Sequence, residues 1–429
     1  MHRPLVFITL RGGVVLNYRR YEHIMEDELS TLVGPEDEDW RVPVSELESR
    51  QADLASRLKE SGHEAALIQT PVDLYYYTGG RQNASFLLTA EGEARLFVRR
   101  SLSRAKHESG GDDSPHTVES FPRMATFAED IGCTPSMQFG ELPHGFAARF
   151  ASKVNATKDC TQIVHSQREI KSEWELQMMA DGADIQLAMF EAVEAVGGEG
   201  VSEIELVAAA EAVSRAAGFG GNVQMRRFPL QCDRGVIVAG RAGGVPSFFD
   251  SAIGGTGPHP MSSMGSGFTK IKANEPVLVD LVHLHRGYVV DATRMYVAGS
   301  LSPQWEERLE DMVAVKEEVV DVLDQGLDCS QAWRQGLALA EELGHGDNLM
   351  GMAPDQSRFL GHSVGLQLDE SPVVAEGFDR PLPIGGTMAI EPKVVHSNGS
   401  IGSEDTWVRD EDGMRPITMD GAVPWITQW

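Results

Sequence analysis

The sequence has little of what marks several common classes of protein. Basic residues number 37 against 64 acidic ones, so the formal net charge is −27, and lysine in particular is scarce. Because a protein that neutralises phosphates needs a basic face, we expect no nucleic-acid partner. The four cysteines are widely spaced, which argues against a disulfide framework and a cysteine-rich zinc site and favours a reducing cytoplasm.

Long apolar runs are missing as well. No segment approaches the ~20 consecutive apolar residues that a membrane helix needs, so we expect no membrane partner. The chain opens with MHRPLVFITLRGG, in which Arg11 interrupts a short apolar stretch and no small-residue cleavage site follows. This pattern differs from that of a secretory signal, and we expect a cytoplasmic protein.

What the sequence does have is length and regular patterning. With 429 residues the chain is long enough for two domains. Residues 1–43 form a weakly patterned N-terminal extension, and residues 44–165 alternate short strand and helix candidates as an α/β domain does. Residues 166–429 combine long helices with paired strands, which predicts an α+β domain with an antiparallel sheet.

The expected elements follow from the helical or alternating spacing of apolar residues. Helices are expected at 44–60, 101–107, 123–131, 146–154, 168–196, 202–217, 303–323 and 330–343. Strands are expected at 65–68, 85–89, 94–98, 137–140, 236–238, 276–281, 288–297, 387–391 and 402–408.

The segment 276–297, PVLVDLVHLHRGYVVDATRMYV, predicts a β-hairpin whose strands are joined by HLHRG. Each strand carries one aspartate among apolar residues, Asp280 and Asp291. A turn centred between them would set the two carboxylates opposite each other on one face, roughly 5 Å apart. Two ionised carboxylates this close must share a proton or hold a cation. The alternative is that one aspartate only caps a turn.

Three further side chains lie in similar surroundings downstream. His362 is flanked by glycines in GHSVGL, Glu391 ends an apolar strand in MAIEP, and Glu404 lies in IGSEDT. Each signal is weak alone, since a single histidine is more often a core or surface residue than a ligand. Together with the two aspartates they form a set of five candidate metal ligands within one domain.

The chemistry of this set limits the ions that it would bind. Four carboxylates and one imidazole offer mostly hard oxygen ligands, which favours two divalent ions of the manganese, iron or cobalt type, with zinc as a further candidate. Two ions ~3.5–4 Å apart can activate a water for attack on a carbonyl group. Glu391, if it lies near that water, could carry the proton.

The order Asp, Asp, His, Glu, Glu in the contexts VLVDL, YVVDATR, GHSVGL, IEP and GSEDT resembles the pita-bread metallopeptidases, such as methionine aminopeptidase, Xaa-Pro aminopeptidase and prolidase. REIKSEWELQMM resembles the opening of their catalytic domain, and the preceding α/β domain resembles the creatinase/prolidase N-terminal domain. The resemblance covers about residues 44–429. It implies a C-terminal pita-bread (creatinase/aminopeptidase) fold, a small-molecule or short-peptide substrate, and a homodimer.

The resemblance also implies a role for each residue. Asp280 would bind one ion and His362 the other, Asp291 and Glu404 would bridge or chelate, and Glu391 would bind metal beside the attacking water. Arg294, in DATR, would orient a carboxylate from behind the ligands.

Two histidines of the family pattern are missing. The peptidases usually have one upstream of the first aspartate, at a position where this chain has Ser263, and His259 could replace it only if the loop carries an insertion. A second usually follows the ligand histidine, where this chain has Asp369. An aspartate there would favour a cationic substrate group over a developing oxyanion, unless it is simply an exposed acid.

Three functions stay open from the sequence. The leading hypothesis is a dinuclear metallohydrolase of a small peptide or amide, nominally an Xaa-Pro peptidase. The alternative keeps the fold and the metals but assigns C–N hydrolysis of a compatible solute such as ectoine, or lyase cleavage of dimethylsulfoniopropionate. The acidic, lysine-poor composition and the missing histidines favour this alternative modestly. A non-catalytic binding module is less favoured, because all five candidate ligands are retained.

Overall fold

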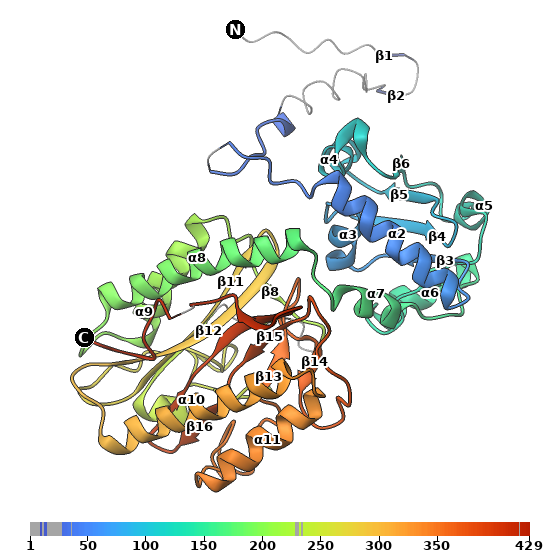
Figure 1. Cartoon of the computed structure of the whole chain (residues 1–429). Coiled ribbons are helices and arrows are strands. Elements are labelled where there is room, and N and C mark those ends of the chain that lie inside the picture. The colour runs from blue at the N-terminus through green and yellow to red at the C-terminus, as the bar shows by residue number, and fades with distance from the viewer. Residues whose placement is uncertain are drawn as a thin grey trace. The chain divides into compact units, whose positions relative to one another are not determined.

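The computed structural model (Figure 1) describes residues 28–35, 37–227, 231–232, 235–419 and 421–429, and the backbone of two short strands, β1 (Thr9–Leu10) and β2 (Gly13–Val14). Most of the predicted N-terminal extension, 1–43, therefore lies outside the described residues. The chain forms two compact units, Met1–Val164 and His165–Trp429. Among the residues that the structure describes, no helix is both long and apolar enough to cross a membrane.

The N-terminal unit is an α/β domain. Its further strands are β3 (Ala65–Ile68), β4 (Ala84–Thr89), β5 (Ala94–Val98), β6 (Thr117–Ser120) and β7 (Ser136–Met137). Its helices are α2 (Val44–Glu60), α3 (Pro71–Thr78), α4 (Leu102–Glu108), η1 (Gly111–Asp113), α5 (Phe127–Ile131) and α6 (His144–Val154), and α7 (Thr161–Arg168) leads into the next unit.

The sheet of this unit is mixed, with the strand order β6-β5-β4-β3-β7. The three central strands are antiparallel and each outer strand is parallel to its neighbour. Alternate residues of β3, Ala65 and Leu67, pack with Phe127 of α5 and Phe150 of α6 in one apolar core. Burial of such side chains is the main stabilising contribution, about 1.5–3 kcal/mol for each large one.

The C-terminal unit is an α+β domain, as predicted. Its helices are α8 (Glu173–Val196), α9 (Glu203–Ala216), η2 (Gly240–Gly244), α10 (Pro303–Asp324) and α11 (Cys329–Glu342). Its strands are β8 (Val223–Gln224), β9 (Gln231–Cys232), β10 (Gly235–Ala239), β11 (Val277–His285), β12 (Tyr288–Val297), β13 (Gly361–Ser363), β14 (Glu370–Val374), β15 (Thr387–Ile390), β16 (Lys393–His396), β17 (Gly399–Gly402), β18 (Asp405–Asp410), β19 (Gly413–Pro416) and β20 (Ile426–Gln428).

Two larger sheets organise this unit, with strand orders β10-β11-β12-β20 and β14-β13-β15-β18-β19. Side chains of the first sheet alternate between two cores, as the period of two requires. Val277 and Val279 belong to the core that contains α8 and α9. Leu278 and Met295 belong to the core that contains α10 and α11. Figure 1 shows α8 lying along β11 and β12.

The first long helix begins later than the predicted 168–196. Ser172 is its N-cap, and the side chains and backbone N–H groups of Ser172 and Glu175 bond reciprocally in a capping box. Such a cap satisfies backbone donors that a helix start leaves unpaired and contributes about 1 kcal/mol. Residues 168–171 therefore end the preceding segment, and Arg168 and Lys171 are positioned to form a buried cluster with Glu370.

Candidate metal centre

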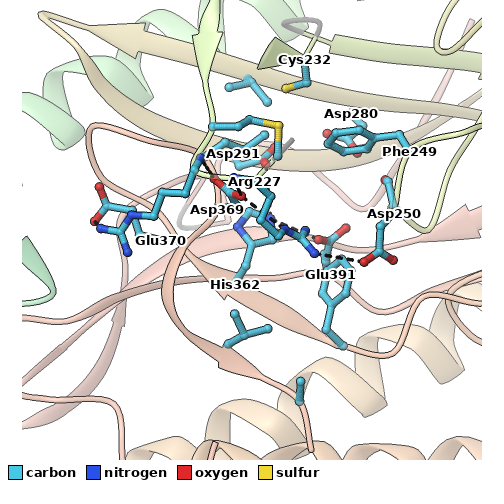
Figure 2. A pocket seen from close by; sticks show the side chains of 18 of the residues that line it. Arg227, Cys232, Phe249, Asp250, Asp280, Asp291, His362, Asp369, Glu370 and Glu391 are labelled. Carbon is cyan, nitrogen blue, oxygen red and sulfur yellow. Dashed lines mark hydrogen bonds and ion pairs between the residues drawn. The ribbon is translucent and has the colours of Figure 1, made fainter. Parts of the chain in front are cut away.

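The five candidate ligands come from separate segments that meet in the C-terminal unit. Asp280 lies on β11, Asp291 on β12 and His362 on β13, Glu391 follows β15 directly, and Glu404 lies between β17 and β18. Figure 2 shows Asp280, Asp291, His362 and Glu391 around one pocket. Both aspartates lie on the face of the sheet that is directed toward α10 and α11. This is the same face as that of Leu278 and Met295, because side chains an even number of residues apart on a strand share a face.

The β11–β12 hairpin has a different register from the one predicted. Asp280 pairs with Thr293, so its carboxylate is diagonal to Asp291 rather than directly opposite. The turn consists of only two residues, Arg286 and Gly287, whose φ angles are 50° and 98°, instead of the five residues HLHRG. Such turns match the twist of antiparallel strands. The predicted register is therefore wrong by two positions. Because side chains on a strand return to the same face every two residues, both carboxylates still share one face.

Asp291, His362 and Glu404 form one half of the centre. One potential ligand atom from each of the three lies within 4.8 Å of the others. The distance from His362 Nε2 to Asp291 Oδ2 is 4.0 Å. Asp291 Oδ1 and Glu404 Oε1 are buried and have no hydrogen-bond partner within the part of the chain that the structure describes. Because an unpaired buried carboxylate oxygen is costly, this arrangement is typical of a site that receives a cation.

A break in the predicted strand 402–408 positions Glu404. Strand β17 ends at Gly402 and β18 begins at Asp405, and Glu404 forms an isolated bridge with Thr293 of β12. The Thr293 hydroxyl donates to Glu404 Oε2 at 2.7 Å. Arg294 donates to the carbonyl oxygen of Glu404 at 2.9 Å and to Asp405 Oδ1 at 2.9 Å. Arg294 thus holds the backbone of a candidate ligand in place, from behind it.

Lys393 lies in the other half of the centre and was not predicted. Its side chain is fully buried, and Nζ lies 2.6 Å from Glu391 Oε2, 2.7 Å from Glu404 Oε2 and 3.1 Å from Asp280 Oδ2. His362 Nε2 lies 3.2 Å from the other oxygen of Glu391. A lysine ammonium therefore connects three of the four carboxylates.

The charges of the centre shift the pKa values of its groups in opposite directions. Burial together with repulsion from Glu404 and Asp280 raises the pKa of Asp291 well above its usual value. Burial raises the pKa of Glu404 to about 8, although Lys393 opposes this shift. Burial would also raise the pKa of Glu391, but Lys393 and His362 outweigh it and lower that pKa to about 2. The negative charge of the centre is thus only partly compensated by its own side chains.

These side chains fit a divalent ion in one half of the centre better than in the other. Asp291, His362 and Glu404 offer open oxygen and nitrogen atoms of the kind that manganese, iron, cobalt or zinc accept. On the side of Asp280 and Glu391, the oxygens that a second ion would need contact Lys393.

The centre opens into a cavity of about 420 Å³. Asp280, Asp291, His362 and Glu391 contribute to its wall, and apolar side chains such as Phe359 form much of the remainder. Three arginines, Arg226, Arg227 and Arg358, also line it. A cavity of this size, mainly apolar with a few convergent polar groups, is typical of a small-molecule site.

The two residues considered as replacements for the missing histidines lie in different places. His259 is exposed in a turn that pairs with Ser262, and it is not among the described residues that line the cavity. Asp369 does line it, but its oxygens accept the backbone N–H groups of Arg226 and Arg227 at 2.6 and 3.0 Å. In Figure 2 the side chain of Arg227 extends from Asp369 to Asp250. Catalytic roles for His259 and Asp369 stay predictions.

One sequence signal could have pointed to Lys393. The segment EPKVV places a lysine two residues after the candidate ligand Glu391 and before two valines, a run typical of a buried strand. Lysine is rarely fully buried unless it is paired, so a lysine in such a strand indicates a nearby carboxylate. The sequence alone does not tell which carboxylates it meets.

Comparisons with known proteins agree with this geometry. The sequence pattern of metallopeptidase family M24 matches residues 177–411, and that of the creatinase/prolidase N-terminal domain matches residues 50–170. The Xaa-Pro dipeptidase of Pyrococcus horikoshii is 25% identical over 361 residues, which cover 83% of this chain and 92% of that protein. The Xaa-Pro dipeptidase of Pyrococcus furiosus is 24% identical over 378 residues, covering 87% and 98%.

Solved structures show the same fold. The X-Pro aminopeptidase from Thermotoga maritima superposes with a TM-score of 0.72 at 18% identity, covering 88% of this chain and 99% of that one. The dipeptidase PepE from Mycobacterium ulcerans gives a TM-score of 0.74 at 18% identity, covering 91% and 100%. The predicted pita-bread fold with an N-terminal creatinase-like domain is therefore confirmed. The chain belongs to metallopeptidase family M24 and is a hydrolytic enzyme of that family.

Proposed function

We propose that this enzyme hydrolyses Xaa-Pro dipeptides in the cytoplasm with the help of a divalent metal ion. The observation that carries the proposal is the cluster of Asp291, His362 and Glu404, with open buried ligand atoms, at a cavity of dipeptide size. Two relatives are named Xaa-Pro dipeptidase and match most of the chain, which supports the same substrate class here.

The side chains of the centre have different roles in the proposed hydrolysis. A divalent ion, when bound, supplies a Lewis acid that increases the acidity of water and polarises a carbonyl group. Asp291, His362 and Glu404 would hold it, and we favour manganese because two carboxylates and one histidine give a mainly oxygen site. Glu391 faces the cavity beside the cluster, so it is the carboxylate placed to carry a proton from the attacking water to the leaving amine.

The cavity wall supports a short peptide with a free carboxylate. Arg358 is exposed and lines the cavity, and no hydrogen bond or ion pair ties its guanidinium to another described residue. A guanidinium in this position can bind the terminal carboxylate of a dipeptide. Apolar side chains such as Phe249 and Phe359 offer a surface for a proline ring.

The alternative reactions receive less support from the site. Ectoine hydrolysis or dimethylsulfoniopropionate cleavage would benefit from a carboxylate directed at a cationic group. Asp369, the candidate for that role, is occupied by Arg226 and Arg227, and Asp250 pairs with Arg227. Arg358, which has no ion-pair partner among the described residues, also favours an anionic group in its part of the cavity.

The test is an assay of chelated protein before and after addition of Mn²⁺. We expect cleavage of Ala-Pro, and not of ectoine or dimethylsulfoniopropionate, to return with the metal. The matched control is the His362→Ala variant, which should stay inactive with Mn²⁺ while its far-ultraviolet circular dichroism matches the wild type. Full activity of thoroughly chelated wild type would contradict the proposal. Light scattering of the same sample tests the expected homodimer.

The role of Arg358 has its own test. An Arg358→Met variant should raise KM for Ala-Pro about tenfold, equivalent to ~1.4 kcal/mol, with little change in kcat, because the lost contact exists in both ground and transition states. Ala-Pro amide, which lacks the carboxylate, should show the same KM with both proteins. An unchanged KM for Ala-Pro would remove Arg358 from substrate binding. Arg334→Met, at an exposed pair with Glu376, is the control.

A further inference from the structure

The ammonium group of Lys393 occupies a position within the centre where a metal cation could otherwise lie. Its Nζ contacts one oxygen from each of three carboxylates: Asp280 at 3.1 Å, Glu391 at 2.6 Å and Glu404 at 2.7 Å. An ammonium group has three N–H donors and no acceptor, so these three contacts satisfy it completely. Lysine is almost never fully buried without such partners.

The oxygens of the centre divide into two sets. Asp280 Oδ2, Glu391 Oε2 and Glu404 Oε2 are bonded to Lys393. Asp291 Oδ1 and Glu404 Oε1 have no partner among the described residues, and both residues form the open half together with His362. Glu404 thus takes part in both halves, with one oxygen bonded to Lys393 and the other open to a cation.

A second ion cannot share the half that Lys393 occupies. Divalent ions of this class bind carboxylate oxygens at ~2.0–2.2 Å. An ion on the oxygens of Asp280 and Glu391 would therefore lie close to the ammonium group that those oxygens already contact. Like charges repel strongly in a buried site of low dielectric constant, so either the ion or the ammonium group is excluded.

The backbone around Lys393 keeps its side chain in this position. In the β16–β17 pair, Lys393 lies opposite Gly402. A Cβ atom at Gly402 would come within 2.4 Å of Lys393 Cγ, so the glycine leaves the space through which the lysine stem passes. Gly402 therefore limits the space at the base of the lysine side chain, whose tip is held by the three carboxylates.

From these contacts we propose that Lys393 replaces one of the two metal ions, and that the centre binds a single divalent ion at Asp291, His362 and Glu404. The inference rests on the metal site of the proposed function and differs from the two ions expected from the sequence. In this arrangement Lys393 supplies a permanent positive charge, and the single divalent ion beside it is exchangeable.

The experiment measures how many Mn²⁺ ions bind per chain. Wild type, Lys393→Met and Lys316→Met proteins are freed of metal by chelation and titrated with Mn²⁺, with bound metal quantified after equilibrium dialysis. Lys316 is the matched control, because it is also buried and paired with a carboxylate, Asp405. We expect one equivalent for wild type and Lys316→Met, and two for Lys393→Met.

Electron paramagnetic resonance provides a readout that does not depend on the variant. A single Mn²⁺ gives an isolated six-line spectrum, whereas two ions bridged by Glu404 give a spin-coupled spectrum. We expect the isolated spectrum in wild type at saturating Mn²⁺. Two equivalents or a coupled spectrum in wild type would overturn the inference even if Lys393→Met fails to fold, and so would one equivalent in a folded Lys393→Met protein.

The outcomes also separate this inference from the proposed function. Wild type that binds two Mn²⁺ ions and cleaves Ala-Pro would refute the role of Lys393 and leave the peptidase proposal intact. Wild type that binds one ion and cleaves no dipeptide would do the reverse. Wild type that binds no Mn²⁺ would overturn both.

Discussion

Two of the buried ionic clusters described in the C-terminal unit have opposite compositions. In the metal centre four carboxylates face one lysine, Lys393, and one histidine. In the second cluster a single carboxylate, Glu370, meets Arg168 and Lys171, with Arg226 at 3.9 Å. The carboxylates of the metal centre outnumber its cationic side chains, whereas Glu370 is outnumbered by the cationic side chains around it.

The pKa values of the two clusters reflect this difference. In the metal centre, burial raises the pKa of Asp291 and Glu404. At Glu370, burial alone would also raise the pKa, but Arg168 and Lys171 outweigh it and hold that pKa far below its usual value. A cluster that is neutralised by its own side chains stabilises the fold, whereas one left with excess charge requires an ion from outside.

The largest expected effect is the loss of activity when the excess charge is reduced. Asp291→Asn removes a charged ligand from the open half, and we expect Ala-Pro turnover with Mn²⁺ to fall by about 10³-fold, equivalent to ~4 kcal/mol of transition-state stabilisation. Its metal-free form should unfold no more easily than wild type, since a like charge is removed. If the Asp291→Asn variant turned over Ala-Pro at the wild-type rate, Asp291 would be excluded as a metal ligand. Steady-state kinetics and urea unfolding measure the two quantities.

The opposite result is expected at the second cluster. Glu370→Gln leaves Arg168 and Lys171 buried without their carboxylate, and breaking such a buried pair costs about 3–5 kcal/mol of unfolding free energy. Urea unfolding of wild type and variant measures the difference. Glu376→Gln, at an exposed pair with Arg334, serves as the control and should leave the unfolding curve unchanged. A Glu370→Gln protein as stable as wild type would remove the distinction between the clusters.

The dependence of stability on pH sharpens the comparison further. In metal-free protein the raised pKa of Glu404, about 8, means that the folded state binds more protons than the unfolded state between about pH 4.5 and 8. Stability should therefore fall as the pH rises through that window, by an amount on the order of 3 kcal/mol. Thermal unfolding between pH 5 and 8 measures this slope. Saturating Mn²⁺ should abolish it, and a flat profile without metal would contradict the expectation.

Glu370 should act in the reverse direction, at lower pH. Its pKa is lowered in the folded state, so its contribution is fully present above the unfolded pKa near 4.5 and is lost as the pH falls. Glu370→Gln should therefore lose less stability than wild type when the pH is lowered from 5 to 3. An equally steep acid limb in both proteins would show that other groups dominate there. This effect is the smallest of the set, because many carboxylates titrate together.

Much of the fold and of the candidate site could be predicted, because both depend on local patterns. The spacing of apolar residues placed the long helices α2, α8, α9, α10 and α11 and the strands β3, β4, β5, β10, β12 and β15 to within a few residues, but it did not identify α3, α7, β6, β13, β14 or β16. The five candidate ligands were recognised from short segments that each combine one polar side chain with apolar neighbours, as in VLVDL and YVVDATR. In the structure those five side chains come together, either in the wall of one pocket or in contact with residues that line it.

The errors concern contacts between segments. The hairpin was predicted with a longer turn, and only the strand pairing shows that Arg286 and Gly287 form it. The strand predicted at 402–408 is broken at Glu404, because that residue bridges to Thr293, far away in the sequence. No local pattern contains such information, since it depends on which strand becomes the neighbour.

The sequence by itself determined the types of side chain in the centre and, through the alternation of each strand, the face on which they lie. It could not determine the balance of charge there, because Lys393 meets Asp280 and Glu404 only after β11, β16 and the segment before β18 have packed together. Electrostatic energy depends on distance in space rather than separation along the chain. The number of ions that the centre accepts is therefore a property of the tertiary structure.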